Sequence, residues 1–138
     1  MAATLAERIK QALDEGRILV LGAQVLLGFQ FRAFSEPRFA ELSEPVRHLC
    51  MAGLALLIVA VALVIWPAAY HQLVARGEAT HDLHRFITGV MGWALLPFAL
   101  SLGIDLFVAM TPVAPGPAAI AAGIGGTLVA LTLWYGLQ

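Results

Sequence analysis

The stretch from Leu49 to Tyr70 constrains this chain most strongly, because it runs for 22 residues without a charged side chain. A helix rises about 1.5 Å per residue, so such a segment would be about 33 Å long, close to the roughly 30 Å hydrocarbon core of a bilayer. The alternative is a buried helix of a soluble domain, but such helices keep a polar stripe and rarely run this long without charge. The stretch therefore predicts a membrane span.

The composition of the whole chain agrees with this prediction. Of its 138 residues, 60% are hydrophobic and only 12% are charged, whereas soluble domains carry about 25% charged residues. The net charge of −1 gives no electrostatic basis for binding nucleic acid. Cys50 is the single cysteine, which excludes an internal disulfide and a cysteine-cluster metal site. We expect an integral membrane protein whose first partner is the lipid bilayer.

Periodicity and charge divide the chain into an N-terminal segment and four spans. Residues 1–17 predict an amphipathic helix, because Leu5, Ile9 and Leu13 recur at helical spacing and Thr4–Glu7 has the pattern of a capping box. That helix would lie on the membrane surface or extend the first span into water; both alternatives stay open. The predicted fold is an all-α, four-transmembrane-helix bundle over residues 18–138, with spans at 18–34, 46–71, 86–110 and 117–137.

Small and amide residues within the spans are predicted to mediate helix contacts. Gln24 and Gln30 carry polar side chains that we expect to hydrogen-bond to neighbouring helices. Glycines allow helix backbones to approach closely, which favours oligomers as well as internal packing. The glycines predicted to pack in this way are Gly22, Gly28, Gly123 and Gly126.

Asp105 is the only acidic residue within a predicted span. An acid in that position is a candidate proton or cation site. It follows Arg85 by 20 residues, about 30 Å of helix, which places it near the outer end of its span. The same end carries Arg32, Arg47 and His48. An ion pair between Asp105 and an arginine, tying three spans together, is the structural alternative.

Three histidines gather at the opposite end of the predicted bundle. His71, His81 and His84, with Glu78 nearby, form a candidate metal or haem-edge site, or a group that titrates between about pH 5 and 8. No HExxH signature accompanies them, and histidines in interfacial loops are usually solvated. No cofactor is predicted, while haem or metal at these histidines stays open.

Basic residues predict the sidedness of the bundle. Five of them fall on the side that carries both termini and three fall on the other side, so the positive-inside rule places both termini in the cytoplasm. The five are Arg8, Lys10, Arg17, Arg76 and Arg85, and the three are Arg32, Arg38 and Arg47.

Motifs of catalysis are missing from the sequence: it has no phosphate-binding glycine loop, no serine nucleophile elbow and no dinucleotide fingerprint. We therefore predict no enzyme. The favoured hypothesis is a helix-packing subunit, either in a homo-oligomer or accessory to a larger membrane complex. The alternative is a proton- or cation-coupled transport component that uses Asp105 or the histidines, with its pathway between protomers or against a partner chain.

Several strings within residues 15–110 resemble a family of small bacterial membrane proteins of unknown function. They are Leu26–Phe31, Phe39–Ser43, Pro67–His71 and Gly77–Glu78. The resemblance implies a four-span protein of the bacterial inner membrane, and some family members are labelled sodium/proton antiporters. It supplies no functional residues, and the span after Pro112 lies outside it.

Overall fold

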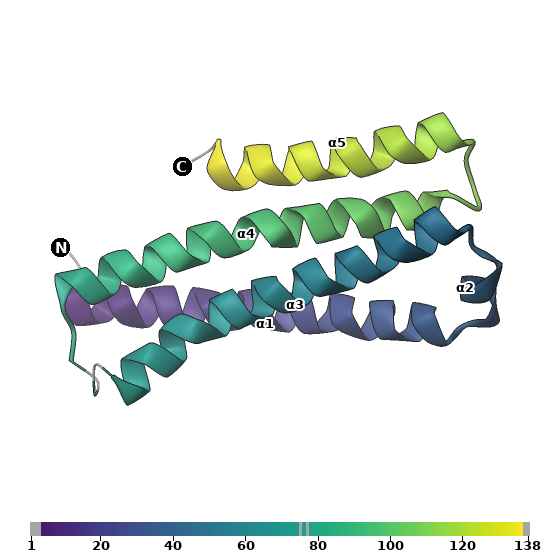
Figure 1. Cartoon of the computed structure of the whole chain (residues 1–138). Coiled ribbons are helices and arrows are strands. Elements are labelled where there is room, and N and C mark those ends of the chain that lie inside the picture. Colours follow the sequence, from purple (N-terminus) through teal and green to yellow (C-terminus); the bar gives the residue numbers. More distant parts are fainter. Residues whose placement is uncertain (1–3, 75, 77, 137–138) are drawn as a thin grey trace.

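The computed structural model describes residues 4–74, 76 and 78–136, and these residues form an all-helical bundle without strands. The four long helices lie lengthwise beside one another, and the short α2 lies at one end (Figure 1). Each long helix is long and apolar enough to cross a membrane, which confirms the predicted four-span membrane fold. The elements are α1 (Leu5–Ser35), α2 (Pro37–Glu41), α3 (Glu44–Leu73), α4 (His81–Met110) and α5 (Gly116–Tyr135).

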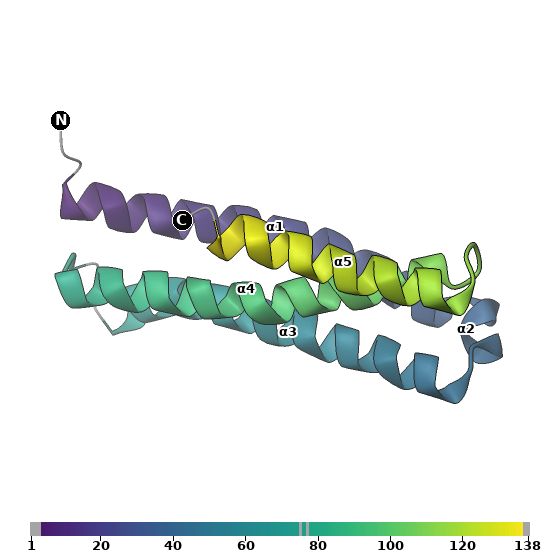
Figure 2. The same ribbon diagram turned by 90° about the horizontal axis from the view of Figure 1, so that it is seen from above.

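Helix α4 is the centre of the bundle. It packs against each of the other three long helices, most extensively against α3 and α5. Helix α1 packs against α3 and α4, whereas α5 rests on α4 (Figure 2). The start of α1 and the end of α5 point toward the same end of the bundle, as four consecutive spans require.

The predicted N-terminal helix is the first part of a longer helix. Helix α1 runs without interruption from Leu5 to Ser35, so of the two open alternatives it is the extension of the first span that the structure contains. A Cβ atom added to Gly16 would lie 3.5 Å from Val64 Cγ1, so this glycine is in ordinary packing contact with α3. Residues 1–3 of the predicted N-terminal helix and residues 137–138 after the last span lie outside the described part of the chain.

The apolar stripe of the N-terminal segment packs against protein. Ile9 and Ala12 form a buried cluster with Leu83 and Ile87 of α4. Thr4 caps α1 through the predicted capping box, and Thr80 caps α4 by accepting a hydrogen bond from the Leu83 amide at 3.2 Å. The stripe is therefore a contact between two helices and does not lie along the bilayer surface.

The helices have unequal lengths, and this defines a part of the bundle that lies beyond α5. Helices α1, α3 and α4 have 31, 30 and 30 residues, about 45 Å each, whereas the 20 residues of α5 span about 30 Å. Helix α5 ends where the Tyr135 hydroxyl donates to the Gly92 carbonyl. A bilayer core of about 30 Å matches the length of α5, and the other three helices are longer than such a core. We call the end of the bundle that residues 5–17, 64–73 and 81–91 form the N-terminal end.

The predicted packing glycines divide into two pairs. A Cβ atom added to Gly123 would lie 2.9 Å from the Gly103 carbonyl oxygen, and one added to Gly126 would lie 2.7 Å from Leu106 Cδ2. Both glycines thus lie in the close contact between α4 and α5. Around Gly22 and Gly28, by contrast, an added Cβ would meet no atom of a described neighbour within 4 Å, so these two glycines are not in a helix contact within the described part of the chain.

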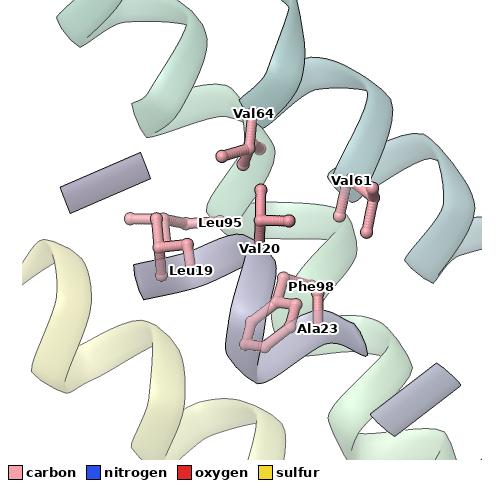
Figure 3. A pocket seen from close by; sticks show the side chains of 9 residues that line it. Leu19, Val20, Ala23, Val61, Val64, Leu95 and Phe98 are labelled. Atoms are coloured by element: carbon pink, nitrogen blue, oxygen red, sulfur yellow. The ribbon is translucent and has the colours of Figure 1, made fainter. Parts of the chain in front are cut away.

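The middle of the bundle is closed by apolar side chains. Figure 3 shows Val20 of α1 among side chains of α3 and α4. The cavity there is about 10 Å³ and is lined entirely by apolar residues, a volume that holds about one water molecule at most. The nine lining residues are Leu19, Val20, Ala23, Ala60, Val61, Val64, Ala94, Leu95 and Phe98.

Candidate functional site

Asp105 of α4 is held by an amide from α1. The Gln30 Nε2 atom donates to both carboxylate oxygens, at 2.7 Å to Oδ1 and 2.8 Å to Oδ2. The Gln30 side chain is buried, with 7% of the residue exposed, and Asp105 is partly buried. The prediction that Gln30 hydrogen-bonds across helices is confirmed, while Gln24 is exposed.

Ser101 extends this contact to a third helix. It lies one turn before Asp105 on α4 and is fully buried, with 0% exposed. Its hydroxyl lies 3.2 Å from Gln30 Nε2, from which it accepts, and it donates to the Gly53 carbonyl oxygen of α3 at 2.9 Å. A Cβ on Gly53 would lie 3.0 Å from Ile104 Cγ2, so glycine at this position permits the close approach. We call Gln30, Ser101 and Asp105 the polar cluster.

The Gln30 amide is not fully satisfied by its neighbours. Its Nε2 atom carries two hydrogens and faces three acceptor atoms. Its Oε1 atom is buried and has no hydrogen-bond partner among the described residues. A buried polar atom without a partner costs about 1–3 kcal/mol, and each such atom in a folded protein calls for an explanation. The polar cluster can therefore accept one more hydrogen-bond donor at Gln30 Oε1, which a purely structural contact would not require.

A cleft of about 730 Å³ opens beside the polar cluster, and both Gln30 and Asp105 line it. Its walls come from the end of α1, α2, the start of α3 and the end of α4. Two aromatic side chains of its lining, Phe34 and Phe39, contact each other edge to face, with ring centroids 4.7 Å apart. We call this space the α2 cleft. Its volume lies within the range of about 300–1,000 Å³ that is usual for small-molecule sites.

The charged side chains in the lining of the α2 cleft favour a cation. Besides Asp105, the lining contains Glu36, Glu41 and Arg38, so acids outnumber bases. Glu36 Oε1 lies 3.8 Å from Arg32 Nε, and both side chains are more than half exposed. A solvated ion pair of this kind contributes little to the stability of the fold.

The structure does not contain the predicted ion pair of Asp105. Within the described chain, no ion pair joins Asp105 to Arg32, Arg47 or His48. Arg32 lies two residues beyond Gln30, about 200° further around α1, and pairs with Glu36. Arg47 precedes Gly53, the α3 residue at the polar cluster, by six residues, about 9 Å along the helix. The amide of Gln30 holds the place that the prediction gave to an arginine.

The predicted histidine cluster lies at the N-terminal end, far from the polar cluster. His71 is near the end of α3, His81 and His84 are in the first turn of α4, and Glu78 lies between these helices. In the part of the chain that the structure describes, no group of three or more His, Cys, Asp or Glu side chains is arranged to hold a metal ion. The four residues share one end of the bundle without forming such a site.

Ser101 and Gly53 are the site residues that the sequence analysis missed. Ser101 and Asp105 are four residues apart, so they lie on one face of a helix, and this spacing was a usable signal. Gly53 participates through its backbone carbonyl, which every residue has, so no sequence signal could have identified it.

Comparison with known proteins places the chain in a family. Neither the curated proteins nor the solved structures gave a match. A family of unknown function, DUF6328, matches residues 3–138. The match includes α5, the span that the sequence resemblance had left out. Because it extends over nearly the whole sequence, the chain belongs to the family of unknown function DUF6328.

Proposed function

We propose that this membrane protein binds a proton or another cation at Asp105 and works as a component of cation-coupled transport. The observation that carries the proposal is a carboxylate within a span that is held by a buried amide and borders the α2 cleft. An ionised acid within a span is costly, up to about 2.5–3.5 kcal/mol at the centre and less toward the end where Asp105 lies. Binding a proton or a cation removes that charge, so occupancy of the site and the energy of the bundle are coupled.

The closed middle of the bundle limits what one chain does. The α2 cleft lies at one end, and the apolar seam around Val20 separates it from the N-terminal end. One chain in this conformation therefore offers a binding site and no continuous polar passage. We propose that the transport pathway forms between chains or in a second conformation. Binding and release break no covalent bond, so the proposal makes this protein a binding component and not an enzyme.

The test is cation flux in proteoliposomes that contain the purified full-length chain. A pH-sensitive dye inside the vesicles reports proton movement after a sodium or potassium gradient is imposed. We expect Asp105→Asn to abolish the flux, and the matched control Asp14→Asn, an acid exposed at the N-terminal end, to leave it unchanged. Equal flux from wild type and a folded, monodisperse Asp105→Asn protein would sink the proposal.

A second function, the helix-packing subunit, is favoured by the outward glycines. Gly22 and Gly28 lie on exposed parts of α1, with open space at the position of a Cβ atom. Small residues at such exposed positions are common where transmembrane helices pack against each other. We expect Gly22→Leu to lower the mass of the assembly in native mass spectrometry from a mild detergent, without loss of helical content. An unchanged mass would remove this support.

The charges at the two ends support an orientation with both termini in the cytoplasm, in the bacterial inner membrane that the sequence resemblance implies. The side that carries the start of α1 and the end of α5 has five basic residues, and the opposite side has three. Green fluorescent protein fused after residue 138 should therefore fluoresce, and alkaline phosphatase at the same point should be inactive. The reverse pattern would invert the topology.

A further inference from the structure

We propose that the ligand of the α2 cleft is a lipophilic organic cation with a single positive charge. The inference rests on the proposed function, because it names the class of cation that Asp105 would bind. The α2 cleft of about 730 Å³ is far larger than a proton or a bare metal ion requires. It has the size of a site for a small molecule.

The polar cluster has too few oxygen atoms for a hard metal ion. Such ions need many oxygen ligands, about six to eight in the case of Ca²⁺. Both carboxylate oxygens of Asp105 already face the Gln30 amide, and the Ser101 hydroxyl donates to the Gly53 carbonyl. A diffuse cation needs no coordination shell, because a single carboxylate nearby balances its charge.

The remaining lining suits the apolar body of such a ligand. Phe29, Phe34 and Phe39 all border the α2 cleft. Aromatic faces attract cations by about 0.5–2 kcal/mol, and they also contact hydrocarbon and aromatic groups favourably. Phe29 is 66% exposed, so the cleft borders the membrane surface, where lipophilic cations accumulate.

The charges around the α2 cleft select against anions and limit the ligand to one charge. Three acids and one arginine line it, and Arg32 partly offsets Glu36 at 3.8 Å. Arg38 remains as a positive charge in the lining. A second positive charge on the ligand would lack a second partly buried acid, because the other two acids of the lining, Glu36 and Glu41, are exposed.

A second groove among the described residues lacks this combination. A groove of about 440 Å³ beside α4 and α5 is lined by apolar residues and Thr127 only. It can take up apolar molecules but offers no acid. A probe that simply partitions into apolar grooves would therefore bind regardless of its charge and regardless of Asp105.

The experiment measures equilibrium binding of radiolabelled tetraphenylphosphonium to the detergent-purified full-length chain, with empty micelles subtracted. The competitor tetraphenylborate has the same shape and the opposite charge. We expect saturable binding that unlabelled tetraphenylphosphonium displaces and tetraphenylborate does not. Asp105→Asn should weaken binding at least about tenfold, because the charge partner of a partly buried cation is lost. Phe39→Leu should weaken it about 2- to 10-fold, and Asp14→Asn should not change it.

The possible outcomes separate this inference from the proposed function. Binding that is saturable and weakened by both Asp105→Asn and Phe39→Leu supports it. Binding that is not saturable, or that Asp105→Asn leaves unchanged, overturns it. Proton or sodium flux that depends on Asp105, without binding of tetraphenylphosphonium, overturns the ligand class while the proposed function stands.

Cys50 provides a second measurement that needs no substitution, because this single cysteine lines the α2 cleft. Its alkylation by N-ethylmaleimide, followed by intact mass, should slow at least about threefold in saturating tetraphenylphosphonium. The same concentration of tetraphenylborate should leave the rate unchanged. Equal slowing by both ions would contradict binding in the cleft.

Discussion

The N-terminal end and the region of the α2 cleft are made by the same three long helices, yet their interiors are opposite in character. At the N-terminal end, α1 and α4 bury Ile9 and Ile87 between them, and charged residues such as Arg17 lie on the surface. At the α2 cleft, the buried contact between the same helices is the polar cluster, and Phe29 faces outward.

One physical explanation of this difference is the solvent around each region, and the predictions below test it. In water, burying apolar side chains drives helix association. In lipid that driving force between helices is absent, so close packing and interhelical hydrogen bonds take its place. The apolar seam around Val20 lies between the two regions, and on α4 the buried contacts change from apolar to polar between Phe98 and Ser101. Each prediction below tests where this change occurs and how strong it is.

The largest effect is expected from Ile87→Ala, which opens a cavity in the fully buried cluster of the N-terminal end. Such substitutions cost about 2–5 kcal/mol. The matched variant is Leu57→Ala, at a fully buried residue of α3 in the lipid-embedded part. It should cost less, because the transfer from water contributes nothing there. Unfolding in mixed SDS micelles, followed by circular dichroism, gives both values; equal losses would mean that lipid surrounds both positions.

The contact between α4 and α5 gives the next largest effect. Gly103→Ala would place a Cβ atom 2.8 Å from the Gly123 carbonyl oxygen, which forces the helices apart at about 1–3 kcal/mol. Gly22→Ala meets no neighbour within 4 Å and should be neutral or slightly stabilising, since alanine favours helix more than glycine. The same unfolding assay compares them. A harmless Gly103→Ala would show that α5 is held loosely.

The polar cluster predicts a smaller effect from Ser101→Ala. The substitution removes one buried hydrogen bond to the Gly53 carbonyl and one from Gln30, at about 0.5–1.5 kcal/mol. Its control is Ser35→Ala, because the Ser35 hydroxyl donates to the Phe31 carbonyl at an exposed position. A loss at Ser101 no larger than the loss at Ser35 would show that hydrogen bonds do not hold this part of the bundle.

Sequence patterns predicted the spans well because hydropathy acts residue by residue along each helix. The uncharged stretch Leu49–Tyr70 lies within α3, and Gln30 forms the interhelical hydrogen bonds expected of it. The partner of Asp105 was predicted wrongly because the rotation of one helix against another decides it. Gln30 and Arg32 are equally near Asp105 in depth, and only the packing of α1 against α4 selects the amide.

The sequence could not decide between the two alternatives for the N-terminal helix, a surface helix or an extension of the first span, for a related reason. The pattern of Leu5, Ile9 and Leu13 shows that one face is apolar, but it does not identify what covers that face. In the structure Leu83 and Ile87 cover it, and Leu83 lies before residue 86, where the predicted third span begins. The apolar stripe can thus be read from the sequence of α1 alone, whereas the residues that cover it depend on how α1 packs against α4.

The smallest effect is expected from Asp14→Asn, and it tests the boundary between the two regions. Asp14 Oδ1 lies 3.2 Å from Arg17 Nη1, with 49% and 79% of the two side chains exposed. A solvated ion pair one turn apart contributes at most about 0.5 kcal/mol to the stability of the fold. Salt weakens such an exposed pair further, since the Debye screening length is about 10 Å at 0.1 M and shortens as salt is added. The variant should therefore match wild type in unfolding assays, most closely at high salt. A loss above about 1 kcal/mol that persists at high salt would mean that the pair lies in a medium of low dielectric constant. The bilayer would then cover Arg17, and the apolar packing of the N-terminal end would lie within lipid instead of in water.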